Sequence, residues 1–155
     1  MRPLHYYVDT SVWNFLLEED RPEEQAMTEQ FFQQVATLGQ MAISDIVLQE
    51  IERAAAARRE ALFQLLARYA PEQFRLTDEA KELANRYVQA ELIPARYLPD
   101  ALHLAIAVVE NCDVVVSWNF EHMVKLKTRL GVNGLNKMLG YREIEIVSPQ
   151  EVITP

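Results

Sequence analysis

Short apolar runs alternate along the chain with longer segments in which apolar residues recur every three or four positions. The short runs predict strands at residues 6–10, 40–44, 113–117 and 143–148. The longer segments predict helices at residues 11–19, 22–38, 46–57, 59–70, 78–92, 98–111 and 121–130, with a short one after residue 148. Strands that alternate with helices in this way predict an α/β protein, with a mainly parallel sheet covered by helices on both faces.

Several of these helices carry boundary signals in the sequence. Ser11 suits the N-cap of the first helix, and Pro22 suits the first turn of the second. Residues 44–45 and 77–78 offer Ser, Asp and Thr side chains as caps for two later helices. The sequence Ser-Pro-Gln-Glu at residues 148–151 has the form of a capping box and predicts one more helix start.

Composition and charge narrow the class of protein. A length of 155 residues predicts a single domain, residues 1–155. With 15 basic and 23 acidic side chains the formal net charge is −8, which excludes a general binder of the phosphate backbone. Cys112 is the only cysteine, so an internal disulfide and a thiolate zinc site are excluded. The start of the chain lacks a signal-peptide pattern, and the longest apolar run, 101–109, is too short to span a bilayer. We therefore expect a cytoplasmic protein that does not enter a membrane.

An acid ends the first predicted strand. Asp9 follows a run of apolar and aromatic residues, and Asn119 comes just after the strand at 113–117. In open parallel sheets, ligands bind outside the carboxyl ends of the strands, which is where both side chains are expected. A plainer interpretation remains open for Asp9, because an acid at this point also caps the helix that follows.

Helical phase distinguishes two neighbouring glutamates. With about 100° between successive residues, Glu50 falls inside the apolar stripe of its helix, whereas Glu52 falls on the polar side. A glutamate on a buried face is costly unless it is paired or binds a metal ion. Glu50 is therefore a candidate site residue, although it could instead lie at the edge of the stripe and reach solvent or an arginine.

The helix predicted at 98–111 is apolar almost all round, and its few polar residues share one narrow stripe. Asp100 lies at its start, where an acid is favourable through capping and the helix dipole alone. His103, one turn later, is a possible metal ligand but is more often a satisfied interior histidine. If Asp9, Glu50 and Asp100 converge, they form a carboxylate cluster that repels itself unless a divalent cation binds there. Oxygen ligands of this kind favour Mg²⁺ or Mn²⁺.

Four segments together carry a resemblance to a known family. In order along the chain they are "YYVDTSVW", "ISDIVLQEI", "LPDALHLAIA" and "VVVSWNFEHM". They resemble the four motifs of the PIN domain family, and more narrowly of the VapC-type toxins of toxin–antitoxin pairs. The segment "YREIEIVSPQEV" resembles the usual last strand and tail, so the resemblance covers nearly the whole chain.

The resemblance implies a PIN-like, Rossmann-like fold with a mainly parallel sheet of four to five strands flanked by helices. It also implies an endoribonuclease that depends on Mg²⁺ or Mn²⁺, forms homodimers and is bound by a cognate antitoxin. Asp9, Glu50 and Asp100 match the three acids of the family, as catalytic residues and metal ligands. The fourth motif often carries Asp, and Asn119 stands there in this chain. Asn still offers a carbonyl oxygen as a metal ligand, but it brings no charge.

The proposed chemistry follows from these ligands. A divalent ion held by Asp9 and Asp100 would lower the pKa of a bound water and neutralise charge on a phosphodiester. Glu50 would orient the water as a base or bind a second ion. Thr10 and Ser11, at a helix start, are candidates to hold a phosphate oxygen, with plain helix capping as the alternative. The segment between Glu121 and Glu143 has basic but no acidic side chains, which suggests either a local phosphate track or a solvated helix face.

Three other functions were compared with the sequence, and two of them lack a residue that they need. A haloacid-dehalogenase-like phosphatase needs a second acid two residues after Asp9, where this chain has Ser11. A metal-dependent adhesion module of the form Asp-x-Ser-x-Ser needs a serine where Trp13 stands. The strongest non-enzyme alternative is a catalytically weak PIN-like domain that acts as an interaction module, and Asn119 is its only support in the sequence.

Overall fold

The computed structural model describes residues 2–154, apart from the side chains of residues 37 and 38. Its centre is a five-stranded sheet in the order β3-β2-β1-β4-β5. All neighbouring strands are parallel. The strands are β1 (His5–Val8), β2 (Gln40–Ser44), β3 (Glu72–Phe74), β4 (Val114–Val116) and β5 (Glu145–Val147). This is the α/β PIN-like architecture expected from the sequence.

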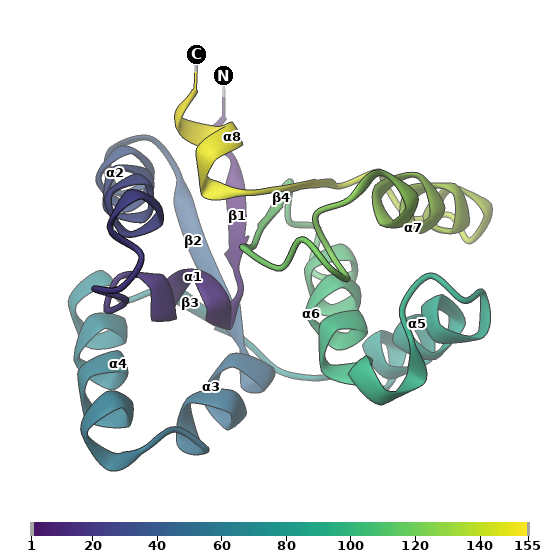
Figure 1. The fold of residues 1–155 in the computed structure, drawn as a ribbon. Helices are drawn as coiled ribbons and strands as arrows, with labels where there is room; N and C mark the ends of the chain where they lie inside the picture. The colour runs from purple at the N-terminus through teal and green to yellow at the C-terminus, as the bar shows by residue number, and fades with distance from the viewer. Residues whose placement is uncertain (1, 155) are drawn as a thin grey trace.

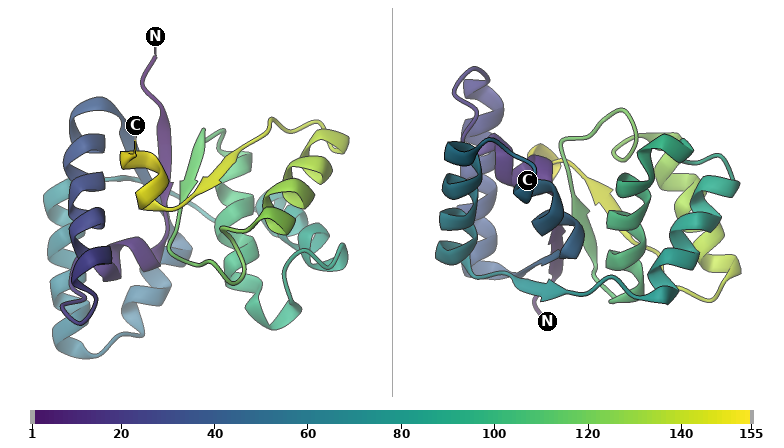
Figure 2. Two further views of the ribbon diagram at one scale, coloured as in Figure 1. Left: turned by 45° about the horizontal axis from the view of Figure 1, so that its top comes forward. Right: turned by 90° about the horizontal axis from the view of Figure 1, so that it is seen from below.

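Helices cover both faces of this sheet. They are α1 (Thr10–Phe15), α2 (Pro22–Leu38), α3 (Asp45–Glu52), α4 (Ala56–Tyr69), α5 (Asp78–Gln89), α6 (Leu98–Val109), α7 (Leu126–Met138) and α8 (Pro149–Ile153), with a 3₁₀ turn η1 (Ala95–Tyr97). Figures 1 and 2 show α2 and α4 on one side of the sheet and α5, α6 and α7 on the other. None of the helices formed by residues 2–154 is long and apolar enough to span a membrane.

Burial on both faces explains the composition of the central strands. The second half of β1 (Tyr7 and Val8) and the whole of β4 (Val114–Val116) are buried. A strand covered by helices on both sides has no solvent face, so it reads as a continuous apolar run rather than an alternating one. The first polar side chains after these strands, Asp9 and Ser117, therefore lie at the carboxyl edge of the sheet, and both are buried there.

Several boundaries agree with the sequence prediction. The helix at 22–38 and the strand at 40–44 have the predicted limits, with Pro22 in the first turn of α2. The side chains of Ser44, Thr77 and Ser148 accept hydrogen bonds from backbone N–H groups at the starts of α3, α5 and α8. The cap of α1 is Asp9 rather than Ser11, so the acid at the end of β1 has a local structural role as well.

Other boundaries differ from the prediction. The helix predicted at 46–57 ends at Glu52, because the backbone leaves the helix at 53–55 before α4 begins at Ala56. The strand β3 was not predicted, since its three residues are too short for a periodic signal. It exists because Ala42, Ile43 and Ser44 of β2 offer it a parallel edge.

The helix predicted at 121–130 is also misplaced. Residues 119–124 form turns instead, and α7 begins at Leu126 and continues past Gly131 to Met138. Glycine disfavours a helix by itself, which is why the prediction stopped before it. In the structure, a Cβ at Gly131 would lie 2.2 Å from the side chain of Leu92. Glycine therefore allows the present close approach of α7 to Leu92, and a larger residue would make the Leu92 side chain move.

Candidate active site

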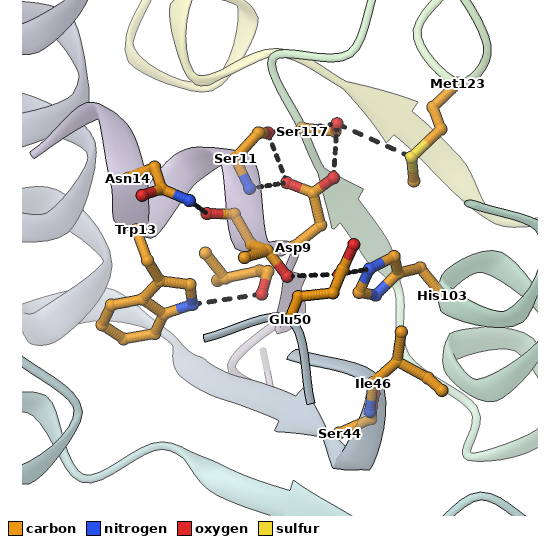
Figure 3. A network of polar contacts seen from close by, with 12 residues as sticks. Asp9, Ser11, Trp13, Asn14, Ser44, Ile46, Glu50, His103, Ser117 and Met123 are labelled. Atoms are coloured by element: carbon orange, nitrogen blue, oxygen red, sulfur yellow. Dashed lines mark hydrogen bonds and ion pairs between the residues drawn. The ribbon is translucent and has the colours of Figure 1, made fainter. Parts of the chain in front are cut away.

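Asp9 lies at the point where β1 ends and α1 begins. Its carboxylate accepts hydrogen bonds from the backbone N–H of Ser11 (3.1 Å), the Ser11 hydroxyl and the Ser117 hydroxyl (2.7 Å). Figure 3 shows this carboxylate between the two serines. Only 4% of Asp9 is exposed, so these hydrogen bonds replace most of the water that a free carboxylate would bind. Asp9 is therefore both a helix cap and a buried acid held in a fixed orientation.

A cavity of about 340 Å³ opens beside Asp9 at the carboxyl edge of the sheet. The residues that line it are Asp9, Thr10, Ser11, Asn14, Glu50, Asp100, His103 and Asn119. All six site residues expected from the sequence are among these eight. Asp9, Glu50 and Asp100 come from three separate parts of the chain, so the fold rather than local sequence brings the acids to one cavity.

Glu50 faces this cavity from α3. One of its oxygens, Oε1, accepts a hydrogen bond from the Thr10 hydroxyl at 2.7 Å and lies 2.6 Å from Nε2 of His103. Glu52, two residues later, is exposed. The helical phase predicted from the sequence is therefore correct.

His103 is a buried histidine with contacts on both ring nitrogens. Its Nδ1 lies 2.7 Å from the Tyr7 hydroxyl, which in turn lies 2.7 Å from the Ser44 hydroxyl. Its Nε2 contacts Glu50, as Figure 3 shows. The expectation of a satisfied interior histidine is correct, but His103 also lines the cavity and orients one of its acids.

The acids and His103 influence one another electrostatically. Burial raises the pKa of Asp9 and of Asp100, although the nearby positive charge of His103 opposes both shifts. Burial would also raise the pKa of Glu50, but the hydrogen bond and charge of His103 outweigh it and the pKa is lowered. Burial would lower the pKa of His103, yet Glu50, Asp9 and Asp100 together raise it. His103 thus relieves part of the repulsion between the three acids.

Asn119 lies between Asp100 and the turn that follows β4. Its Oδ1 accepts a hydrogen bond from the backbone N–H of His122 at 2.9 Å. A backbone N–H can only donate, so this contact fixes which side-chain atom is the oxygen. The other end of the amide is an N–H donor, and its hydrogen bond to Asp100 opposes part of the rise in pKa that burial causes in that acid. Asn119 therefore presents a donor to the cavity, where aspartate would present a second oxygen.

The donor set suits a hard divalent cation, but its atoms are not arranged as a coordination shell. Carboxylate oxygens lining one small cavity are the ligands that Mg²⁺ and Mn²⁺ prefer. Within residues 2–154, no group of three His, Cys, Asp or Glu side chains is close enough together to hold a metal ion. The physical reason is that Glu50 points to His103 and Thr10, while both oxygens of Asp9 accept serine hydrogen bonds. Binding a cation would require these side chains to exchange some of their present partners.

Three residues of the site were not predicted in this role. Ser117 follows β4 directly, and its hydroxyl donates to Asp9 and accepts from the backbone N–H of Asn119 at 2.9 Å. Asn14 lines the cavity one turn into α1. His103 lies on the same polar stripe of its helix as Asp100, and this shared stripe was the only feature of the sequence that pointed to His103. Ser117 gave no signal, because its contact with Asp9 spans 108 positions.

No basic side chain of the segment between Glu121 and Glu143 lines this cavity, and two of its arginines are engaged elsewhere. Arg142 donates to the carbonyl oxygen of Asn111, just before β4, and so lies at the opposite edge of the sheet. Arg129 is 3.4 Å from Glu151 on α8. Besides His103, positive charge near the acids comes from the connection between α3 and α4 and from the first turn of α4. There Arg53 helps to lower the pKa of Glu50, and Arg58 donates to the carbonyl oxygen of Asn14 at 3.2 Å.

Comparisons with known proteins agree with this architecture. The family model described as "PIN domain" matches residues 6–122, which is most of the chain. A comparison with curated protein sequences gives no match.

Three solved structures are similar in fold. VapBC2 from Rickettsia felis, bound to a DNA fragment from its promoter, has a TM-score of 0.59 at 17% identity and covers 94% of this chain and 98% of that one. VapC20 from Mycobacterium tuberculosis, a sarcin–ricin loop cleaving toxin, has a TM-score of 0.56 at 14% identity, covering 90% and 98%. DNA-bound VapBC from Salmonella typhimurium has a TM-score of 0.54 at 20% identity, covering 94% and 98%. At these identities the likeness establishes the fold alone.

Proposed function

Because the chain belongs to the PIN domain family, we propose that it is a divalent-metal-dependent endoribonuclease that hydrolyses RNA phosphodiester bonds. The observation that carries this proposal is the convergence of Asp9, Glu50 and Asp100 on one cavity. Three acids from separate elements are costly to bring together, and His103 offsets only part of their repulsion. A cation bound among the acids, next to a phosphodiester, would balance their charge, and this would explain why the fold brings them together.

Asp9 and Asp100 would hold the cation, with Glu50 as a further candidate ligand. Asn119 could offer its oxygen only after that oxygen had released the backbone N–H of His122. When bound, Mg²⁺ or Mn²⁺ would supply positive charge beside the phosphodiester and lower the pKa of a nearby water. Glu50 is placed to orient the attacking water and accept its proton, because it lines the same cavity and Thr10 fixes its orientation. His103 lowers the pKa of Glu50, which keeps it ionised but makes it a weaker base, so the proton transfer would depend on the cation that lowers the pKa of the water.

Thr10 and Ser11 support this site from the start of α1. The Thr10 hydroxyl donates to Glu50, and the Ser11 hydroxyl donates to Asp9 and accepts from the backbone N–H of Trp118 at 3.0 Å. Both hydroxyls are therefore engaged with their own chain. We propose that they position the acids, and a phosphate contact from either one stays a prediction.

The proposed biological setting is a toxin–antitoxin pair. Two of the similar folds are VapBC complexes bound to DNA, and a third is a toxin that cleaves the sarcin–ricin loop. By analogy, we propose that this chain is the toxin, that RNA is its substrate, that a cognate antitoxin covers its site and that it forms homodimers. The named RNA target does not transfer, because the likeness to these proteins concerns the fold.

A second candidate function is an interaction module with weak catalysis. It is favoured by Asn119, which presents a donor where aspartate would add a carboxylate, and by acids that are not arranged as a coordination shell. Such a module would bind an antitoxin but would cleave RNA poorly at any metal concentration.

Removal of divalent metal separates the two functions. We expect freshly purified protein to cleave single-stranded RNA in Mn²⁺ or Mg²⁺, to stop in excess EDTA and to recover when Mn²⁺ is restored. The reason is that the charge of His103 offsets only part of the repulsion among the three acids, so a cation is needed to stabilise the charge of a phosphodiester. Cleavage that continues in EDTA would contradict the metal-dependent mechanism, and failure to cleave at every metal concentration would favour the interaction module.

Replacement of Asn119 by Asp tests the charge of the proposed metal site. The aspartate side chain would keep the oxygen that faces His122, but a second oxygen would replace the donor to Asp100. We expect Asn119→Asp to bind Mn²⁺ more tightly in calorimetric titration and to need less metal for half-maximal cleavage, because the added charge lies at close range. Turnover is expected to slow if the more negative site holds product phosphate less well.

The control is Asn85→Asp, which adds the same charge at an exposed position on α5. We expect one tightly held Mn²⁺ in the wild type. Equal affinity for Mn²⁺ in the wild type, Asn119→Asp and Asn85→Asp would place Asn119 outside the metal shell. Two tightly bound ions already in the wild type would do the same.

A further inference from the structure

A second cavity adjoins the proposed active site. It has a volume of about 600 Å³ and shares Asn119 with the cavity of the three acids. Its walls come from the end of α1, the start of α2, the turn after β4 and α8, through Phe15, Met27, Trp118, Phe120 and Gln150. A polymer whose backbone passes Asn119 therefore also passes this cavity, because Asn119 lines both.

Aromatic rings form one side of this cavity. The ring centroids of Phe15 and Trp118 are 5.5 Å apart, and those of Trp118 and Phe120 are 6.0 Å apart. The indole N–H of Trp118 donates to the buried Thr28 hydroxyl at 2.9 Å, which fixes the indole ring. Phe120 comes directly after Asn119 and is 53% exposed. An exposed phenylalanine in a turn contributes little to the core, and its position next to the acids points to a binding role.

We propose that this cavity binds one unpaired nucleobase of the RNA, stacked on Phe120 and next to the scissile phosphate. This inference rests on the proposed nuclease function and adds a specificity site to it. Unpaired bases bind to proteins by stacking on aromatic side chains, because every base presents a flat apolar face. Shared Asn119 connects the base cavity to the acids, so stacking would also fix the position of the phosphate.

Charges around the cavity favour a base over a phosphate. Glu23, Glu24 and Glu121 lie among its walls and would repel the RNA backbone. The same carboxylates can accept hydrogen bonds from the N–H groups on a base edge. Glu23 is exposed, and no ion-pair partner for it is found in residues 2–154. We therefore expect a preference for bases with an amino group over uracil.

The same chemistry also suits a cationic side chain of a partner protein, but the cavity already supplies its own cation. The guanidinium of Arg21 lies 5.8 Å from the centre of the Phe15 ring and 3.1 Å from Glu24. This internal pair occupies one aromatic wall and neutralises one acid. The surface that remains is the exposed ring of Phe120, which suits a neutral flat group better than another cation.

The test combines a protein variant with a modified RNA. In a short single-stranded RNA with one defined cleavage position, each nucleotide next to that position is replaced in turn by an abasic one. For the wild type we expect one abasic substitution to raise KM about tenfold, in the range expected for losing one stacked base, with little change in kcat. Phe120→Ala is expected to raise KM for the intact RNA by a similar factor. For this variant the abasic substitution should cause no further change in KM.

Two further variants control for folding and for loss of exposed apolar surface. Phe120→Trp keeps a stacking ring and should restore the low KM. Met138→Ala removes an apolar side chain that is 82% exposed at the far end of α7, and it should behave as the wild type. The same comparison is made without turnover, by fluorescence anisotropy of labelled RNA bound to proteins that carry Asp9→Asn as a second substitution.

The outcomes are distinguishable. The inference is supported if the abasic substitution weakens binding to the wild type but not to Phe120→Ala, both in KM and in anisotropy. This holds even if the protein cuts RNA slowly. An unchanged KM and affinity in Phe120→Ala, or equal sensitivity to abasic RNA in both proteins, overturns it while leaving the nuclease proposal intact. Binding of an oligoarginine peptide that Phe120→Ala abolishes, with RNA affinity unchanged, would assign the cavity to a basic partner and also overturn the inference. A wild type that neither binds nor cuts RNA contradicts both proposals.

Discussion

Replacing Asp9 or Asp100 by Asn is expected to lower metal-dependent RNA cleavage by about 10²–10³-fold, the range seen when one electrostatic stabilising group is removed. Each substitution removes a negative charge and one carboxylate oxygen from the proposed metal site. The measurement is the initial rate of cleavage of a labelled RNA in saturating Mn²⁺. Variants that cut at the wild-type rate would contradict the assignment of both acids.

The fold is expected to survive these substitutions. Asn at position 9 can keep the oxygen that caps α1 at Ser11, and the Ser117 hydroxyl can accept from the new amide. Burial raises the pKa of Asp9, which means that its charge is costly in the metal-free protein. In EDTA we therefore expect the melting temperature of Asp9→Asn to equal or exceed that of the wild type. Addition of Mn²⁺ should raise the melting temperature of the wild type and not that of the variant, because only a bound ion stabilises the folded state.

Glu50→Gln is expected to lower cleavage by about 10²-fold or more, the usual contribution of a general base. The glutamine keeps nearly the same shape and can still accept from Thr10, but it loses the charge that pairs with His103. The measurement is kcat in saturating Mn²⁺, with urea denaturation to confirm folding.

Glu52→Gln is the matched control on the same helix. Its side chain is exposed on the opposite side of α3, so its kcat is expected to stay within about twofold of the wild type, as for other surface changes remote from a site. Equal losses in the two variants, or a loss at Glu52 alone, would show that the orientation of Glu50 toward the cavity has no functional meaning.

Most of the fold was predictable from local sequence, and the misses depend on contacts between elements that are distant in the chain. The limits of α2 and β2 follow from Pro22, the helical period and a short apolar run. The strand β3 and the start of α7 could not be predicted from local signals. A three-residue strand forms only where a neighbouring edge accepts it, and α7 continues through Gly131 at a point where it approaches Leu92 closely.

The sequence by itself determined which acids face the cavity. The apolar period of α3 separates Glu50 from Glu52, the end of β1 marks Asp9, and the polar stripe of α6 marks Asp100. In each case a few neighbouring residues are enough, because alternation and helical phase are properties of one element.

Only the tertiary structure decided how these acids are held. Ser117 reaches Asp9 across 108 positions, and His103 pairs with Glu50 across 53. The direction of the Asn119 amide depends on a backbone N–H in the turn after β4, where the sequence predicted a helix. Whether a hydrogen bond forms between distant elements is decided by differences of a few tenths of an ångström in the donor–acceptor distance, which local periodicity does not encode. The donor that Asn119 presents to Asp100 was therefore visible only once the strands and helices had been placed together.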